Sequence, residues 1–182
     1  GLTDFIENTL GGVHHRFKRG YKNVIDEAQR LNKEGINCPL AIETSGHAAL
    51  RENYFLDDGA YLVTKIIIAM AKLGEKGCKI GDVLSQLSEP AETYENRFTI
   101  TVEDFIAFGK NVLEEFAAFV KTQDGWNIVK DNYEGVRVSV DKHFGDGWIL
   151  LRMSLHDPAM PINIESNTVG GVDIILNVFK KF

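Results

Sequence analysis

Apolar side chains recur at helical spacing in the first half of the chain, on both sides of a short apolar run. One helix is predicted over residues 21–34, with Gly35 suited to its end, and a second over residues 59–73, with Asp58 as its N-cap. The run between them predicts a buried strand over residues 38–43 and a polar loop over 44–57. This helix–strand–helix order indicates an α/β arrangement, in which ligands bind at the carboxyl ends of strands. The expected apolar sides consist of Tyr21, Val24, Ile25, Ala28 and Leu31, and of Tyr61, Leu62, Ile66, Ala69, Met70 and Leu73.

The pattern changes after Ser88-Glu89-Pro90, where Pro90 disfavours helix in the preceding residue. A short helix over 79–87 precedes this boundary. Beyond it we expect a strand at 94–101, a helix from about 101–103 to 121, strands at 126–130, 135–140, 147–153 and 161–165, and a last helix over 168–182. Strands joined by hairpin-length connections predict an α+β domain, an antiparallel sheet of about four strands with two helices on one face. The expected domains are therefore residues 1–90 and 91–182. The two helices should direct Phe105, Phe108, Val112, Phe116 and Val120, and Val172, Ile175, Val178 and Phe179, toward the core.

Composition places the chain among ordinary globular proteins, with 182 residues, 44% hydrophobic and 25% charged. A chain of more than ~150 residues can bury a sizeable core without disulfides or metals. The two cysteines, Cys38 and Cys78, lie far apart in the sequence, which argues against a disulfide scaffold or zinc site and suits a reducing cytoplasm. The longest apolar stretch, residues 66–71, is too short to span a bilayer. Because the sequence starts at Gly1 and its first residues do not open a domain cleanly, we expect it to be part of a longer protein.

A basic cluster runs from His14 to Lys22 in a chain whose net charge is −6. It is compatible with a solvated helix start, an RNA-binding patch or a site for a small anion. The acidic remainder favours the small anion over a nucleic acid, since a polyanion would be repelled elsewhere on the surface.

The first candidate for chemistry is Glu43-Thr44-Ser45-Gly46-His47, directly after the predicted strand. A carboxylate, hydroxyls and an imidazole together supply donors and acceptors for a ligand with many hydroxyl groups, and Gly46 permits close backbone approach. The alternative is an ordinary polar loop. Downstream, Asp57-Asp58-Gly59 is weak support for Mg²⁺, and capping of a helix by Asp58 is the stronger interpretation.

The second candidate is the run from Gly147 to Pro158, where an apolar strand leads into Arg152, Ser154 and His156. The arginine side chain presents a planar fork that matches phosphate oxygens, and Ser154 and His156 add donors. A tight turn before Pro158 could direct backbone N–H groups at the same anion. The alternative is a hairpin whose Arg152 pairs with a surface carboxylate such as Asp157.

These two stretches, in this order, resemble the α-D-phosphohexomutases, the family of phosphoglucomutases and phosphomannomutases. The sugar loop of that family reads E-x-S-G-H, as at Glu43–His47, and is followed by D-D-G, as at Asp57–Gly59. Its phosphate loop reads R-x-S-x-T-E-P after G-W-x-L-x-R; here Gly147–Pro158 fits, except that His156 and Asp157 replace Thr and Glu. The stretch Glu134–Val140 also resembles the family's D-G-x-R-V strand.

The resemblance implies a C-terminal part of such an enzyme: the end of domain 3, and domain 4 with a TATA-binding-protein-like fold. It implies that Glu43, Ser45, Gly46 and His47 bind sugar hydroxyls, and that Arg152, Ser154 and His156 bind the phosphate that is not reacting. His15, with His14 as the alternative, and Lys18 are the candidates for proton transfer or charge balance.

In the whole enzyme, a phosphoserine would exchange phosphoryl groups with a hexose phosphate through a bisphosphorylated sugar. That serine and the D-G-D-x-D-R loop that holds Mg²⁺ belong to other domains, so the expected partners are a hexose phosphate and the N-terminal domains, with no nucleic acid or membrane. By itself the chain should be inactive. A non-catalytic sugar-phosphate-binding or regulatory protein, and an interaction module built on Arg16–Lys22, are the alternatives. Whether the sugar is glucose, mannose, glucosamine or a pentose is left open.

Overall fold

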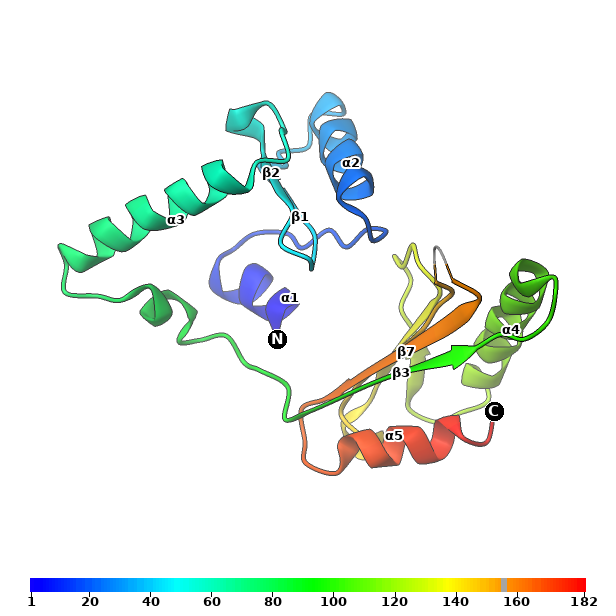
Figure 1. Ribbon diagram of the computed structural model, residues 1–182. Helices are drawn as coiled ribbons and strands as arrows, with labels where there is room; N and C mark the ends of the chain where they lie inside the picture. The colour runs from blue at the N-terminus through cyan, green and yellow to red at the C-terminus, as the bar shows by residue number, and fades with distance from the viewer. Residues whose placement is uncertain (155–156) are drawn as a thin grey trace. The chain divides into compact units, whose positions relative to one another are not determined.

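The structure, a computed structural model, describes residues 1–154 and 157–182. It divides into two compact units, Leu2–Leu87 and Ser88–Phe182, with Gly1 grouped with the second. Figure 1 shows the helices and strands of both units.

The first unit contains three α-helices among its described residues, and the helices predicted at 21–34 and 59–73 are confirmed. The helices and turns are α1 (Leu2–Asp4), a helical turn at Phe5–Thr9, α2 (Tyr21–Lys33), a turn of 3-10 helix at Arg51–Asn53, α3 (Gly59–Gly74) and a 3-10 helix at Ile80–Leu84. Asp58 caps α3 as predicted, because its carboxylate accepts a hydrogen bond from the backbone N–H of Tyr61 at 2.9 Å.

Two short strands, β1 (Leu40–Ile42) and β2 (Ala48–Leu50), form an antiparallel hairpin in this unit. The prediction of an uninterrupted loop over 44–57 was therefore wrong. The expectation of a buried strand was also wrong, since only Ala41 in β1 is buried and Ile42 is 54% exposed. The hairpin nevertheless places residues 43–47 in the tight connection between its strands.

Helix α3 has no buried residue among those that the structure describes. Of its predicted inward side, Tyr61, Leu62, Ala69 and Leu73 are half-buried, whereas Ile66 and Met70 are exposed. Ile66, Ile67 and Met70 are all more than two-fifths exposed. A two-stranded hairpin offers too little surface to cover a helix that is apolar on most sides. Such a helix usually lies in the interior of a larger domain. In the part of the chain described by the structure, no helix combines the length and the apolar character that a transmembrane span requires.

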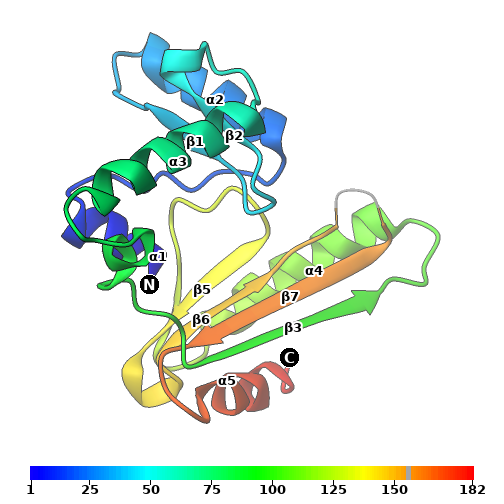
Figure 2. The ribbon, with the colours of Figure 1, turned by 60° about the vertical axis from the view of Figure 1, so that its left-hand side comes forward.

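The second unit follows the predicted order of strand, helix, four strands and helix. Its described elements are β3 (Glu92–Thr99), α4 (Phe105–Val120), β4 (Trp126–Ile128), β5 (Val136–Val140), a 3-10 turn at Lys142–Phe144, β6 (Gly147–Leu151), β7 (Ala159–Ser166) and α5 (Gly171–Phe179). The strands form an antiparallel sheet in the order β3-β7-β6-β5-β4, which has five strands rather than about four. Figure 2 shows the long strands β3 and β7 side by side.

Alternation along the strands determines which face of this sheet is buried. Val138, Ile149 and Ile164 lie opposite one another on successive strands and are at most 1% exposed. Phe116 of α4 and Ile175 of α5 belong to the same core, which confirms the prediction of two helices on one face. Of the side chains expected to point inward from α4, Phe108 is instead 45% exposed. The complete buried core of this unit consists of Ile100, Phe116, Val120, Trp126, Val138, Val140, Ile149, Leu151, Met160, Ile162, Ile164, Val172 and Ile175.

Candidate functional site

The loop from Glu43 to His47 is a closed turn whose side chains stay at the surface. The backbone N–H of Glu43 donates to the carbonyl of His47, and that of Gly46 donates to the carbonyl of Glu43, both at 2.9 Å. Gly46 has φ of +91°, a conformation that L side chains rarely adopt, so glycine is the residue that this turn requires. The turn thereby presents Glu43, Thr44 and Ser45 together.

Within this turn, Glu43 collects hydrogen bonds from its two neighbours. Its carboxylate accepts from the Thr44 hydroxyl at 3.1 Å, from the backbone N–H of Ser45 at 3.0 Å, and from the Ser45 hydroxyl. The bond from the Ser45 hydroxyl is the main cause that lowers the pKa of Glu43 below its ordinary value, and the charge of Arg19 adds to it. The loop is thus a cluster of an ionised acceptor and two hydroxyls, a set able to exchange its internal bonds for those of a hydroxylated ligand.

His47 is fixed at the other end of the turn by two residues that sequence reasoning did not select. Its Nδ1 lies 2.8 Å from a carboxylate oxygen of Asp57, and the ring of Tyr21 stacks on it with centroids 5.1 Å apart. The sequence suggests Asp57 as a weak metal ligand and as part of the D-D-G motif, and Tyr21 as an apolar residue of the helix at 21–34. No periodicity could have shown their contacts with His47, because they come from separate parts of the chain.

His15 lies in a different set of contacts, against helix α2. Its Nε2 is 2.9 Å from Oε1 of Glu27, whose side chain is 7% exposed. Arg30 donates to both oxygens of the same carboxylate at 2.8 Å. The hydrogen bonds from Arg30 are the main cause that lowers the pKa of Glu27 to about 2, and His15 contributes to it. Glu27 is therefore an ionised, nearly buried partner that orients the imidazole of His15.

Other members of the basic cluster also have partners in the first unit. Nδ1 of His14 is 2.9 Å from the hydroxyl of Thr3, and Lys22 pairs with Asp26 one helical turn further along α2. Lys18 is exposed. The structure thus separates the two histidines: His14 contacts the N-terminal segment, and His15 contacts α2.

In the second unit, Arg152 follows directly on β6, as the sequence predicts. Its side chain is 7% exposed, and Nη1 lies 3.6 Å from Oε1 of Glu134. The expected alternative partner, Asp157, instead lies near Ser154: the Ser154 hydroxyl is 3.4 Å from the Asp157 carboxylate and accepts from the Asp157 N–H at 3.3 Å. Arg152 and Ser154 thus have different partners at the start of the β6–β7 connection, and His156 lies outside the described residues.

The residues that the structure describes include no group of three or more His, Cys, Asp or Glu able to hold a metal ion. Asp58 is occupied as the cap of α3, and Asp57 lies against His47. Among residues 1–154 and 157–182, Asp57 and Asp58 therefore do not form a Mg²⁺ site, and Cys38 and Cys78 are free thiols.

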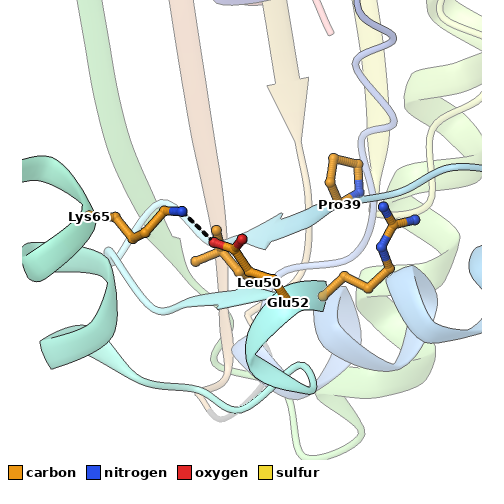
Figure 3. A pocket seen from close by; sticks show the side chains of 5 residues that line it. Pro39, Leu50, Glu52 and Lys65 are labelled. Atoms are coloured by element: carbon orange, nitrogen blue, oxygen red, sulfur yellow. Dashed lines mark ion pairs between the residues drawn. The ribbon is translucent and has the colours of Figure 1, made fainter. Parts of the chain in front are cut away.

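A hollow on the first unit is lined by side chains other than the predicted site residues. Figure 3 shows the ion pair at its rim, where Nζ of Lys65 lies 2.6 Å from Oε1 of Glu52. Pro39, Leu50 and Arg51 complete the lining. The guanidinium of Arg51 donates to the side-chain oxygens of Asn32 and Asn37, and these hydrogen bonds stabilise the local fold.

The sequence and the fold of the chain both resemble those of known proteins. Residues 1–90 match the family model described as phosphoglucomutase/phosphomannomutase, alpha/beta/alpha domain III. Residues 1–90 of the chain belong to the phosphoglucomutase/phosphomannomutase family. Phosphoglucomutases from Neisseria gonorrhoeae and from Neisseria meningitidis serogroup A are each 29% identical over 149 residues, which cover 78% of this chain and 28% of each relative.

A solved structure of a family protein from Burkholderia thailandensis supports the fold. It is 22% identical in sequence, superposes with a TM-score of 0.71, and the match covers 100% of this chain and 34% of that protein. The chain thus spans between about a quarter and a third of the length of these phosphohexomutase relatives.

Proposed function

We propose that this chain is the C-terminal part of a phosphohexomutase, which interconverts hexose 1-phosphate and hexose 6-phosphate through a phosphoserine and a bisphosphorylated sugar. The observation that carries the proposal is the turn at Glu43–His47. It displays an ionised carboxylate, two hydroxyls and an oriented imidazole in the loop whose sequence resembles the family's sugar-binding motif. These groups match the alternating donors and acceptors of a sugar ring.

The roles proposed for the two loops are binding and orientation. Glu43 and Ser45 would accept from and donate to ring hydroxyls, with Gly46 and His47 completing the contact. Arg152, Ser154 and His156 would hold the phosphate that does not react. Phosphoryl transfer depends on positioning and on electrostatic stabilisation, so these contacts would contribute directly to rate. His15, oriented by Glu27, and Lys18 are proposed for proton transfer or charge balance at the reacting oxygen.

Helix α3 supports the view that further domain structure completes the first unit. Its exposed apolar side chains would be covered by the rest of the alpha/beta/alpha domain in a longer protein. The phosphoserine and Mg²⁺ are proposed to belong to other domains of that longer protein. The 182-residue chain alone is accordingly expected to show no mutase turnover, and a cytoplasmic location stays a prediction.

The test is turnover of glucose 1-phosphate, mannose 1-phosphate and ribose 1-phosphate by the longer protein. We expect activity on at least one of them and a loss of about 2–4 kcal/mol in transition-state stabilisation for Arg152→Ala. Glu43→Gln should also lower kcat/KM, whereas Glu75→Gln, which changes an exposed carboxylate after α3, should not. Turnover that is unaffected by Glu43→Gln and Arg152→Ala would overturn the proposed roles.

A further inference from the structure

Arg152 is buried to a degree that is unusual for a side chain expected to bind an anion. Only 7% of the side chain is exposed, and its carboxylate partner Glu134 is 17% exposed. Nη1 of Arg152 also donates to the carbonyl of Met153 at 3.3 Å. A buried guanidinium that lost its counter-ion would strongly destabilise the fold. The carboxylate of Glu134 therefore stabilises Arg152 in its buried position.

Hydrogen bonds within the turn before β5 fix the backbone that carries Glu134 near Arg152. The side-chain amide of Asn132 donates to the carbonyls of Glu134 and Gly135, both at 2.9 Å. Val136 pairs with Leu151 where β5 begins and β6 ends, so Gly135 and Arg152 lie just outside the ladder and Glu134 is one residue further out at the same end of the two strands.

Gly135 shows how closely the turn lies against the start of the predicted phosphate loop. Its φ is +63°, and a Cβ atom there would lie 2.2 Å from the carbonyl oxygen of Leu151 and 2.7 Å from Cα of Arg152. Both of these atoms belong to the main chain, so they cannot move away from the added Cβ as the end of a flexible side chain could. The turn therefore fits against Arg152 only with glycine at this position.

We propose that Glu134 is a positioning residue that holds the guanidinium of Arg152 in the orientation in which it binds phosphate. The proposal rests on the proposed function of Arg152 and extends it to a residue that touches no ligand. A guanidinium is a planar fork, so the ion pair of Nη1 with Glu134, together with its hydrogen bond to the Met153 carbonyl, restricts the directions of the remaining N–H groups as well. Phosphate would then meet donors that are already oriented.

The first experiment observes the side chain itself, without any ligand. In the ¹⁵N-labelled 182-residue chain, the Nε–Hε signal of Arg152 is assigned by its loss in Arg152→Lys, and rotation about the Nε–Cζ bond is measured by NMR. We expect slow rotation in the original chain, rotation at least about tenfold faster in Glu134→Gln, and slow rotation again in Glu134→Asp, which keeps the charge. Equal rotation in Glu134→Gln and the original chain would overturn the proposal.

The second experiment titrates the same proteins with inorganic phosphate. Glu134→Gln should weaken phosphate binding about tenfold, with partial recovery in Glu134→Asp. The control is Glu165→Gln, which removes the same charge from a carboxylate that accepts from Trp148 on the same sheet at 3.0 Å. Its phosphate affinity should not change.

The outcomes separate this proposal from the proposed function. Slow, Glu134-dependent rotation without any effect of Arg152→Lys on phosphate binding would support the positioning and contradict the phosphate role. Tighter phosphate binding by Glu134→Gln would show that Glu134 competes with the anion, and would overturn the positioning. A chemical-denaturation series identifies any variant that is unfolded. If Glu134→Gln is unfolded, fast rotation of the Arg152 guanidinium in the original chain would still overturn the proposal.

Discussion

Replacement of Glu27 by Gln is expected to destabilise the Leu2–Leu87 unit by about 2 kcal/mol at neutral pH. The carboxylate is 7% exposed and is hydrogen-bonded by Arg30 and His15. Its pKa is lowered from the ordinary value of 4.5 to about 2. At ~1.4 kcal/mol per pKa unit this difference sets an upper figure of about 3 kcal/mol, and we reduce it because Arg30 is half exposed to solvent.

The sign of this contribution fixes its pH dependence. A carboxyl whose pKa is lowered by folding stabilises the native state above its ordinary pKa, and the contribution is lost as the pH falls toward the folded value. The difference in unfolding free energy between the original chain and Glu27→Gln should therefore be constant above about pH 5.5 and shrink from there toward pH 2.

The assay is urea unfolding at several pH values, followed by far-ultraviolet circular dichroism for the helices of the first unit. Both tryptophans, Trp126 and Trp148, lie in the second unit, so their fluorescence reports that unit separately. The control is Glu34→Gln, since Glu34 pairs with the same Arg30 but is 54% exposed, and it should cost less than about 0.5 kcal/mol. A Glu27→Gln effect that is as small as the control, or that is the same at pH 3 and pH 7, would refute the reasoning.

Three further changes test other parts of the structure. Ser166→Ala should cost about 1–2 kcal/mol in tryptophan-detected unfolding, because the fully buried hydroxyl donates to the carbonyl of Gly145 at 2.6 Å; no change would mean that this bond contributes nothing. Glu92→Ala should cost about 1 kcal/mol in the same assay, since its carboxylate accepts from the N–H groups of Gly170 and Val172 at the start of α5, and Glu95→Ala, on the same strand, is its control. Asp58→Ala should lower the helix signal of the first unit with a loss of about 1 kcal/mol, whereas Asp58→Asn should retain most of the stability.

The second unit could be predicted closely from its sequence because each strand alternates and each connection is short. Val136, Val138 and Val140 recur at every second position, and all three lie on the face that α4 and α5 cover. The fifth strand was visible in the pattern at 94–101, although the expected sheet had about four. The N-cap of α4 lies one to three residues later than predicted, since Asp104 accepts from the N–H of Ala107 and the helix was expected to begin at about 101–103.

The first unit was harder to predict because its elements are short and its apolar residues face outward. Strand β2 begins with Ala48-Ala49, and alanine has little tendency to form strands, so the hairpin was read as a loop. The apolar side of α3 is only partly covered by the described residues, because Tyr61, Leu62, Ala69 and Leu73 are half-buried and none of its residues is buried. Periodicity reports which side of a helix is apolar, and it cannot report whether the surface that would cover it is present.

The candidate site could likewise be predicted only in part. The motifs identify Glu43, Ser45, His47 and Arg152, because these residues are local in the sequence. Their partners come from elsewhere: Asp57 contacts His47 across the hairpin, and Glu134 reaches Arg152 through the β5–β6 register. Such pairs depend on which strands lie side by side, and only the fold can supply them.

The most direct test of the proposed function is to follow the backbone amide signals of both loops by NMR during ligand titrations of the longer protein. The account predicts that glucose shifts the signals of residues 44–47, that inorganic phosphate shifts those of residues 152–157, and that the hexose phosphate that the protein turns over shifts both sets with one common affinity. Two unrelated affinities for that hexose phosphate, or shifts confined to one loop, would contradict the proposed roles of Glu43–His47 and of Arg152 and Ser154.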